Sequence, residues 1–73
     1  MYKYIVYAKI GDMKRFSCFD LSEGDFAGNI IRASWVEDSE RLRAYLQKTA
    51  DNNKGIDLVF QLRHGDKIHF QTH

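Results

Sequence analysis

The feature that most constrains this fold is a pair of alternating apolar patterns separated by one stretch with helical spacing. Alternation at every second residue is typical of a strand with one buried face. It places two sets of side chains on such faces: Tyr4, Val6, Ala8 and Ile10 in residues 3–10, and Ile56, Leu58, Phe60 and Leu62 in residues 56–63. Between them, apolar spacing of three and four residues predicts a helix, through Leu42, Tyr45, Leu46 and Thr49.

Turn-forming residues delimit the other strands. Gly11-Asp12-Met13 predicts a turn in which Gly11 and Asp12 suit a positive φ, and a second strand follows over residues 15–21. The register of this second strand stays open, because two pairs compete for its buried side: Phe16 with Cys18, and Phe19 with Leu21.

The remaining segments complete the expected order. Residues 22–29 hold two glycines and predict a loop, and residues 30–36 predict a third strand. Gly65-Asp66 fits a two-residue hairpin turn that leads into a last strand over residues 67–71.

Capping residues set the ends of the helix. Asp38 or Ser39 is the expected N-cap, and Gly55 is the expected left-handed residue after the helix, which Asn52 and Asn53 help to end. Arg41 and Arg43 are expected to point toward solvent, and Trp35 to pack against Leu42 or Leu46.

These elements predict an α+β chain of one domain over residues 1–73. The order is β-β-β-α-β-β, with a mainly antiparallel sheet and one helix packed on one face. Seventy-three residues can form a core large enough for only one domain. The single cysteine cannot form an intramolecular disulfide.

One helix leaves the opposite face of the sheet open, and this face is the candidate functional surface. The net charge is only +1, but the expected open face carries six Lys or Arg side chains and one acid. Its members are Lys3, Ile5, Tyr7, Lys9, Arg15, Phe19, Arg32, Asp57, Val59, Gln61, Arg63, Lys67 and His69.

Two binding functions compete for this face, and a merely solubilising role for its charges is the plain alternative. The first is a protein partner or a second copy, bound through the face or an exposed edge strand; its candidate residues are Ile5, Tyr7, Phe19, Val59 and Arg63. The second is nucleic acid, held by Lys3, Lys9, Arg15, Arg32, Arg63 and Lys67 with Tyr7 as a stacking platform. A small inhibitor of a macromolecular machine, of the kind that mobile elements encode, fits the same size.

The residues that suggest chemistry have simpler explanations. Cys18 is expected to be a small buried hydrophobic residue. His69 and His73 are expected about 13 Å apart along one strand, too far to share a metal ion, and His64 is expected on the face away from His69. The sequence therefore predicts a binding protein without enzymatic activity, cofactor or metal. With no apolar run long enough for a membrane span, a cytoplasmic setting is expected.

Overall fold

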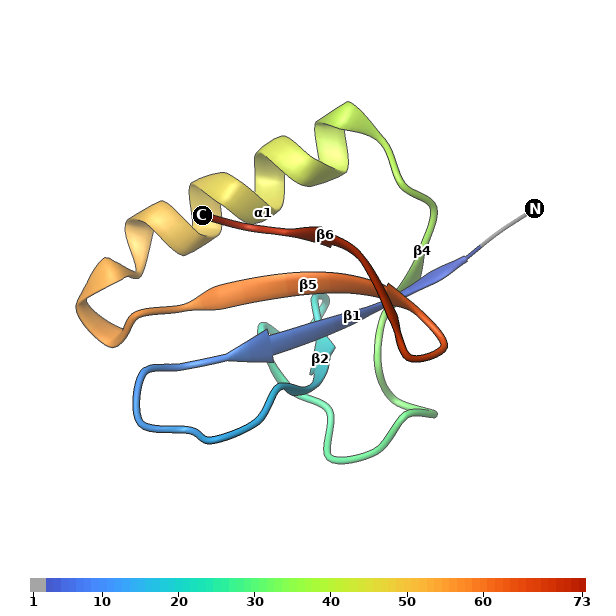
Figure 1. The fold of residues 1–73 in the computed structure, drawn as a ribbon, viewed down its shortest axis with the longest axis horizontal. Coiled ribbons are helices and arrows are strands. Elements are labelled where there is room, and N and C mark those ends of the chain that lie inside the picture. The colour runs from blue at the N-terminus through green and yellow to red at the C-terminus, as the bar shows by residue number, and fades with distance from the viewer. Residues whose placement is uncertain (1–2) are drawn as a thin grey trace.

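The computed structural model describes residues 3–73 and contains an antiparallel sheet with one long helix (Figure 1). The sheet order is β3-β2-β1-β5-β6, and β4 pairs with β1 next to β2. The predicted α+β class is confirmed, with the order β-β-β-β-α-β-β, since residues 25–26 form an additional short strand. The elements are β1 (Tyr4–Lys9), β2 (Ser17–Asp20), β3 (Asp25–Phe26), β4 (Trp35–Val36), α1 (Glu40–Asn52), the 3₁₀ turn η1 (Lys54–Ile56), β5 (Val59–His64) and β6 (Lys67–Gln71).

The core lies between α1 and the central strands β1 and β5. Val6 and Phe60 are fully buried on the sheet, as is Leu46 on the helix. The predicted core faces of both central strands therefore meet the helix, apart from Ile56, which lies in η1 before β5 and is 51% exposed. The helical stripe is rotated from the predicted one: Ala50 is buried, whereas Tyr45 is 52% exposed.

The ends of the helix follow local hydrogen bonding. Of the two predicted N-caps, Ser39 is correct, because its hydroxyl accepts a hydrogen bond from the Leu42 N–H at 3.0 Å. The predicted left-handed role of Gly55 is wrong. The left-handed residue is Asp57, with φ of 56°, which follows η1.

The turn glycines divide into two kinds. Gly65 has φ of 62° in the two-residue turn between β5 and β6, so this predicted hairpin is confirmed. Neither Gly11 nor Asp12 has the predicted positive φ. Gly11 instead allows the backbone to approach Asp57 closely, since a Cβ at residue 11 would lie 3.3 Å from the Cβ of Asp57.

The prediction of a strand over residues 30–36 is wrong for residues 30–34. The backbone N–H of Arg32 and that of Ala33 donate to Asn29 and Ile30, which closes a turn. Trp35 does not pack on the helix: it is 49% exposed, and its indole N–H donates to the carbonyl of Ile30 at 3.2 Å. Apolar alternation in this segment therefore does not reflect a buried strand face.

A β-bulge in β6 changes the face of one residue. Leu62 pairs with Phe70 and Arg63 with Ile68, which leaves His69 as the extra residue between them. The predicted place of His69 on the open face is therefore wrong: its ring stacks on Tyr4 at 4.3 Å, on the helix side. The expected separation from His64 is wrong as well, since His64 contacts the edge of the same Tyr4 ring at 6.1 Å.

Within residues 3–73, α1 and the other helical turn are too short and too polar to form a membrane span.

Candidate functional site

Two rows of side chains cross the sheet on the side away from α1. Residues that pair directly in an antiparallel sheet point to the same face, so the register defines both rows. We call this surface the open face. The first row holds Trp35, Ile5, Arg63 and Ile68, and the second holds Cys18, Tyr7, Gln61 and Gln71, with Lys9 and Val59 paired beside them.

Arg63 is held in place at the centre of the open face. Its guanidinium carbon lies 4.1 Å from the centroid of the Tyr7 ring and 5.5 Å from that of Phe16. Its Nε donates to Gln61 at 2.8 Å, and Gln61 in turn donates to Gln71 at 2.7 Å. Because Nε makes the internal hydrogen bond, the two terminal nitrogens can meet a planar anionic group such as a carboxylate.

Tyr7 is a neutral support for this arginine. Burial raises its pKa above the ordinary value of 10.0, and a hydrogen bond with Cys18 raises it further. A hollow of about 350 Å³ adjoins the ring, and its walls include Met13, Phe16 and Cys18. The expected burial of Cys18 is only partly correct, since its side chain is half-buried and faces Tyr7.

Four of the five predicted partner-binding residues share the open face: Ile5, Tyr7, Val59 and Arg63. The predicted exposure of Ile5 is wrong, since only 5% of it is exposed. The placement of Phe19 there is wrong. Because Tyr7 pairs with Cys18, the next residue of β2 points to the helix side. There Phe19 is 7% exposed and lies edge-on to Phe60 at 5.2 Å.

The residues predicted to bind nucleic acid are spread over several surfaces. Lys9 and Arg63 point to the open face, Lys3 precedes β1, and Arg15 lies in the loop before β2. Arg32 lies close enough to Asp20 to lower the pKa of its carboxyl, whose main perturbation is a hydrogen bond from Ser22. Lys67 borders a hollow of about 200 Å³ with Tyr4, His64 and His69, on the helix side. The predicted concentration of basic side chains on one face is therefore wrong.

Sequence reasoning missed three contributors to the open face. Phe16 could have been found from its spacing of two residues from Cys18, once Cys18 was assigned to this face. Ile68 could not have been found in this way, because simple alternation places it on the same face as Phe70. Only the bulge puts the two side chains on opposite faces. The position of Trp35 directly before the helix predicts packing on the helix, whereas in the structure Trp35 pairs with Ile5 of β1.

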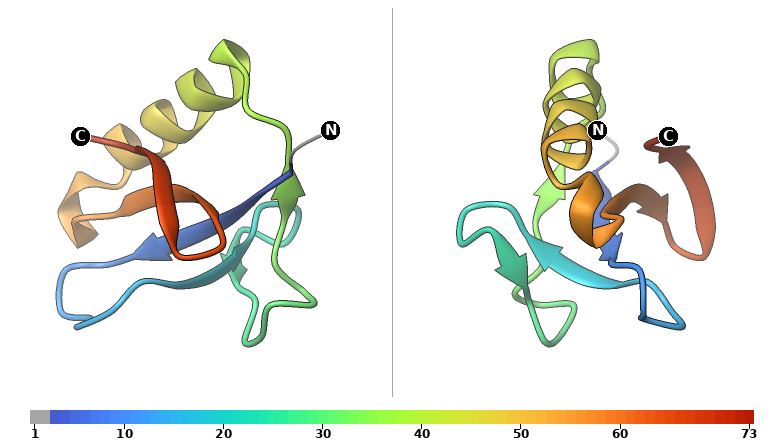
Figure 2. Two further views of the ribbon diagram at one scale, coloured as in Figure 1. Left: turned by 45° about the vertical axis from the view of Figure 1, so that its right-hand side comes forward. Right: turned by 90° about the vertical axis from the view of Figure 1, so that its left-hand side faces the viewer.

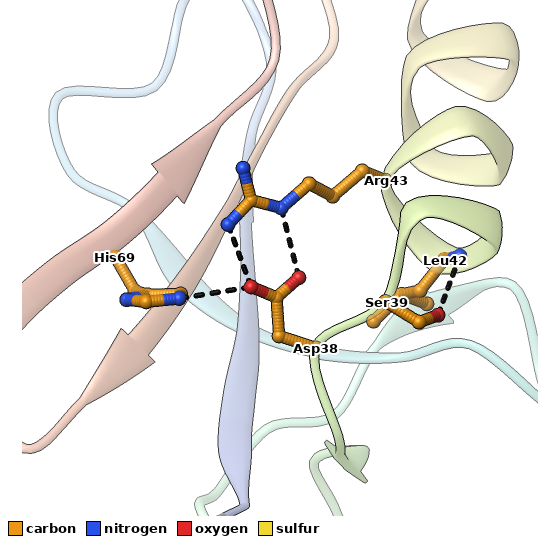
Figure 3. Close-up of polar contacts among 5 residues, drawn as sticks. All are labelled: Asp38, Ser39, Leu42, Arg43 and His69. Carbon is orange, nitrogen blue, oxygen red and sulfur yellow. Dashed lines mark hydrogen bonds and ion pairs between the residues drawn. The ribbon is translucent and has the colours of Figure 1, made fainter.

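A second polar cluster joins the start of the helix to β6 (Figure 3). Asp38 accepts hydrogen bonds from Arg43 at 2.8 and 2.6 Å and contacts Nε2 of His69 at 2.9 Å. The hydrogen bonds from Arg43, with a smaller contribution from His69, lower the pKa of Asp38 to about 2. The expectation that Arg43 points to solvent is wrong, since its guanidinium also lies over Phe70 at 4.7 Å. The cluster is a structural clamp.

Among residues 3–73, no three His, Cys, Asp or Glu side chains are grouped closely enough to hold a metal ion. Comparison with protein-family models, with curated proteins and with solved structures gave no match.

Proposed function

We propose that this chain is a small non-enzymatic interaction protein whose open face binds a protein partner. The observation that carries the proposal is the arrangement of Arg63, which Tyr7, Phe16 and Gln61 hold in one orientation. An immobilised arginine loses little further side-chain entropy on binding, so it can recognise a partner's carboxylate at low cost.

The flanks of Arg63 also suit a protein interface. Trp35 is 49% exposed and Ile68 is 51% exposed, at opposite ends of the row that contains Arg63. Tryptophan, tyrosine and arginine are the residues that most often dominate protein–protein binding energy. A partner that presents apolar side chains around a carboxylate would complement this row.

The face supports the proposal better than the sheet edges do. The bulge at His69 interrupts the outer edge of β6, and β3 at the other edge has only two residues. Bulges and very short strands are features that hinder edge-to-edge pairing. A second copy docked face to face would bring Lys9 and Arg63 of both chains together, so a different, acidic partner fits better.

Nucleic acid fits the same face less well. The Tyr7 ring that would stack on a base is already covered by Arg63, at 4.1 Å. The remaining basic side chains do not form one track for a phosphate backbone. A cytoplasmic setting belongs to the same proposal, because Cys18 would stay a thiol there.

The test is affinity purification from cells that encode the chain, followed by quantitative mass spectrometry. We expect one or more proteins to be retained by the wild type and lost with Arg63→Met and Ile68→Glu. Ile56→Glu is the matched control, because Ile56 has the same 51% exposure as Ile68 but lies on the helix side. Circular dichroism would verify that each variant folds.

Three results would overturn the proposal. One is that no protein distinguishes the wild type from Arg63→Met. Another is a dimer in sedimentation analysis that Ile68→Glu dissociates, which would make the occupant a second copy. The third is salt-sensitive binding of a single-stranded oligonucleotide that Arg63→Met abolishes, which would favour nucleic acid.

A further inference from the structure

The helix leaves part of the core uncovered on its own side of the sheet. α1 packs against β5, and Gln47 exchanges hydrogen bonds with the backbone of His73 after β6. The β2–β3 hairpin extends toward the opposite side of the sheet from β6, away from the helix (Figure 2). One helix is therefore too narrow to cover both ends of this sheet.

An apolar groove of about 310 Å³ lies in the uncovered region. Phe19 and Phe26 of the β2–β3 hairpin form one wall, Tyr45 of α1 forms another, and the fully buried Phe60 contributes to the lining. Tyr45 and Ile56 at the groove are 52% and 51% exposed. This volume is near the lower end of ligand pockets, about 300–1,000 Å³, which suits a few peptide side chains.

Acidic side chains line the groove or the hollows that share residues with it. At one end it shares Asp25 and Phe26 with a hollow that Asp20, Glu23 and Arg32 also line. At the other end it shares Ile10 and Ile56 with a hollow that Asp12 and Asp57 line. Asp25 lines the groove itself, and Asp12 and Asp57 line the hollow beside Ile10 and Ile56. Asp20 lies two residues after Cys18 in β2, so it points to the open face and not into the groove.

We propose that this groove binds a basic amphipathic segment of a protein partner, with apolar side chains in the groove and Lys or Arg at its acidic ends. Charge complementarity selects this occupant, because an acidic peptide or an anionic lipid would meet the like charges of Asp25, Asp12 and Asp57. The surface is distinct from the open face, so the inference goes beyond the function proposed above. Binding at both surfaces would make the chain a bridge between two partners.

The probe for a direct test is a short synthetic helical peptide with Leu at spacings of three and four and Lys elsewhere. Amide chemical shifts of the isotope-labelled full chain would be followed during titration, with a Glu-for-Lys peptide as control. We expect shifts at the residues that line the groove, and binding of the acidic peptide at least about tenfold weaker.

Matched variants separate the groove from general charge attraction. Ile56→Arg should weaken binding of the basic peptide by at least about tenfold, because it places a cation at the groove and removes an apolar wall. Ile68→Arg adds the same charge at a side chain of equal exposure on the open face, and should leave binding unchanged. Asp25→Asn should weaken binding by about two- to fivefold, as expected of one solvated charge pair.

Equal binding by the two isoleucine variants, or shifts outside the groove, would overturn the inference. Equal binding of both peptides would overturn the role of the acidic ends. Concentration-dependent shifts at the groove without peptide would make the occupant a second copy. None of these results bears on the open face, whose test uses Arg63→Met and Ile68→Glu.

Discussion

Removal of the Asp38 carboxylate should destabilise the protein in a pH-dependent way. Asp38 connects three elements: the segment before α1, the helix through Arg43, and β6 through His69. Asp38→Asn keeps the size of the side chain and removes its charge. The predicted loss therefore reports the electrostatic part of the clamp rather than a packing defect.

The magnitude follows from the pKa of Asp38, which falls from 3.8 to about 2. At about 1.36 kcal/mol per pKa unit, this shift corresponds to at most about 2.4 kcal/mol. The side chains of Asp38 and Arg43 are 19% and 40% exposed, so solvent screening reduces the expected loss to about 1–2 kcal/mol. A stability of about 0.05–0.15 kcal/mol per residue is common, so for 73 residues this loss is a substantial part of the total.

The sign of the pH dependence is fixed. A carboxylate with a lowered folded-state pKa stabilises the protein above its unfolded-state pKa, and this contribution is lost as pH falls through the folded-state value. The free-energy difference between wild type and Asp38→Asn should therefore have its full size near pH 7, shrink below about pH 4 and vanish only below about pH 2.

Urea unfolding followed by far-ultraviolet circular dichroism across this pH range would measure the difference. Glu37→Gln is the control, since it removes the same charge from the adjacent exposed residue. Equal unfolding free energies for the two variants near neutral pH, or a difference that persists unchanged to low pH, would refute the role assigned to the Asp38 clamp.

Three further predictions concern a turn, a cap and a phenol. Gly65→Ala should lower the free energy of unfolding by about 1–2 kcal/mol, because φ is 62° at this residue. Gly55→Ala should be neutral or slightly stabilising, since an added Cβ meets nothing within 4 Å. Urea unfolding of both variants would measure the difference. Ser39→Ala should cost about 1 kcal/mol through loss of the N-cap, seen as a lower melting temperature. Ultraviolet pH titrations of the wild type and of Tyr7→Phe should differ by one phenol, that of Tyr7, with a pKa above its ordinary value. Cys18→Ala should lower the pKa of Tyr7. The raised pKa means that ionisation of Tyr7 destabilises the fold at high pH.

The central part of the fold could be predicted because apolar residues recur at every second position of its strands. Val6 and Phe60 belong to this pattern and are fully buried, so it specifies both the strand and its core face. Ile5 and Gln61 on the opposite face are also only 5% and 3% exposed, which the pattern does not predict. The same reasoning placed Tyr7 and Arg63 together on the opposite face. Their stacking contact could not be predicted, because alternation gives a face but not the register between two strands.

The errors occur where hydrogen bonds rather than apolar spacing decide the backbone. Phe16 and Phe19 both lie in the strand predicted over residues 15–21, and only the pairing of Tyr7 with Cys18 shows which one enters the core. The segment before Trp35 alternates like a strand, but the N–H groups of Arg32 and Ala33 bond within a turn. The bulge at His69 has no signal in the sequence, yet it moves His69 from the open face to the clamp.

The net charge of +1 describes neither of the two surfaces, which lie on different sides of one sheet. The open face presents Lys9 and Arg63, while Asp25, Asp12 and Asp57 line the groove or the hollow beside it. Complementary surfaces on one chain carry a risk of head-to-tail assembly that does not close. Shape opposes this assembly, because the groove requires a protruding apolar segment and the open face is formed by side chains along strands. No residue of the groove pairs with a residue of the open face across the sheet. If each surface binds its own partner, the effects of substitutions at Ile56 and Ile68 on binding free energy should therefore be additive.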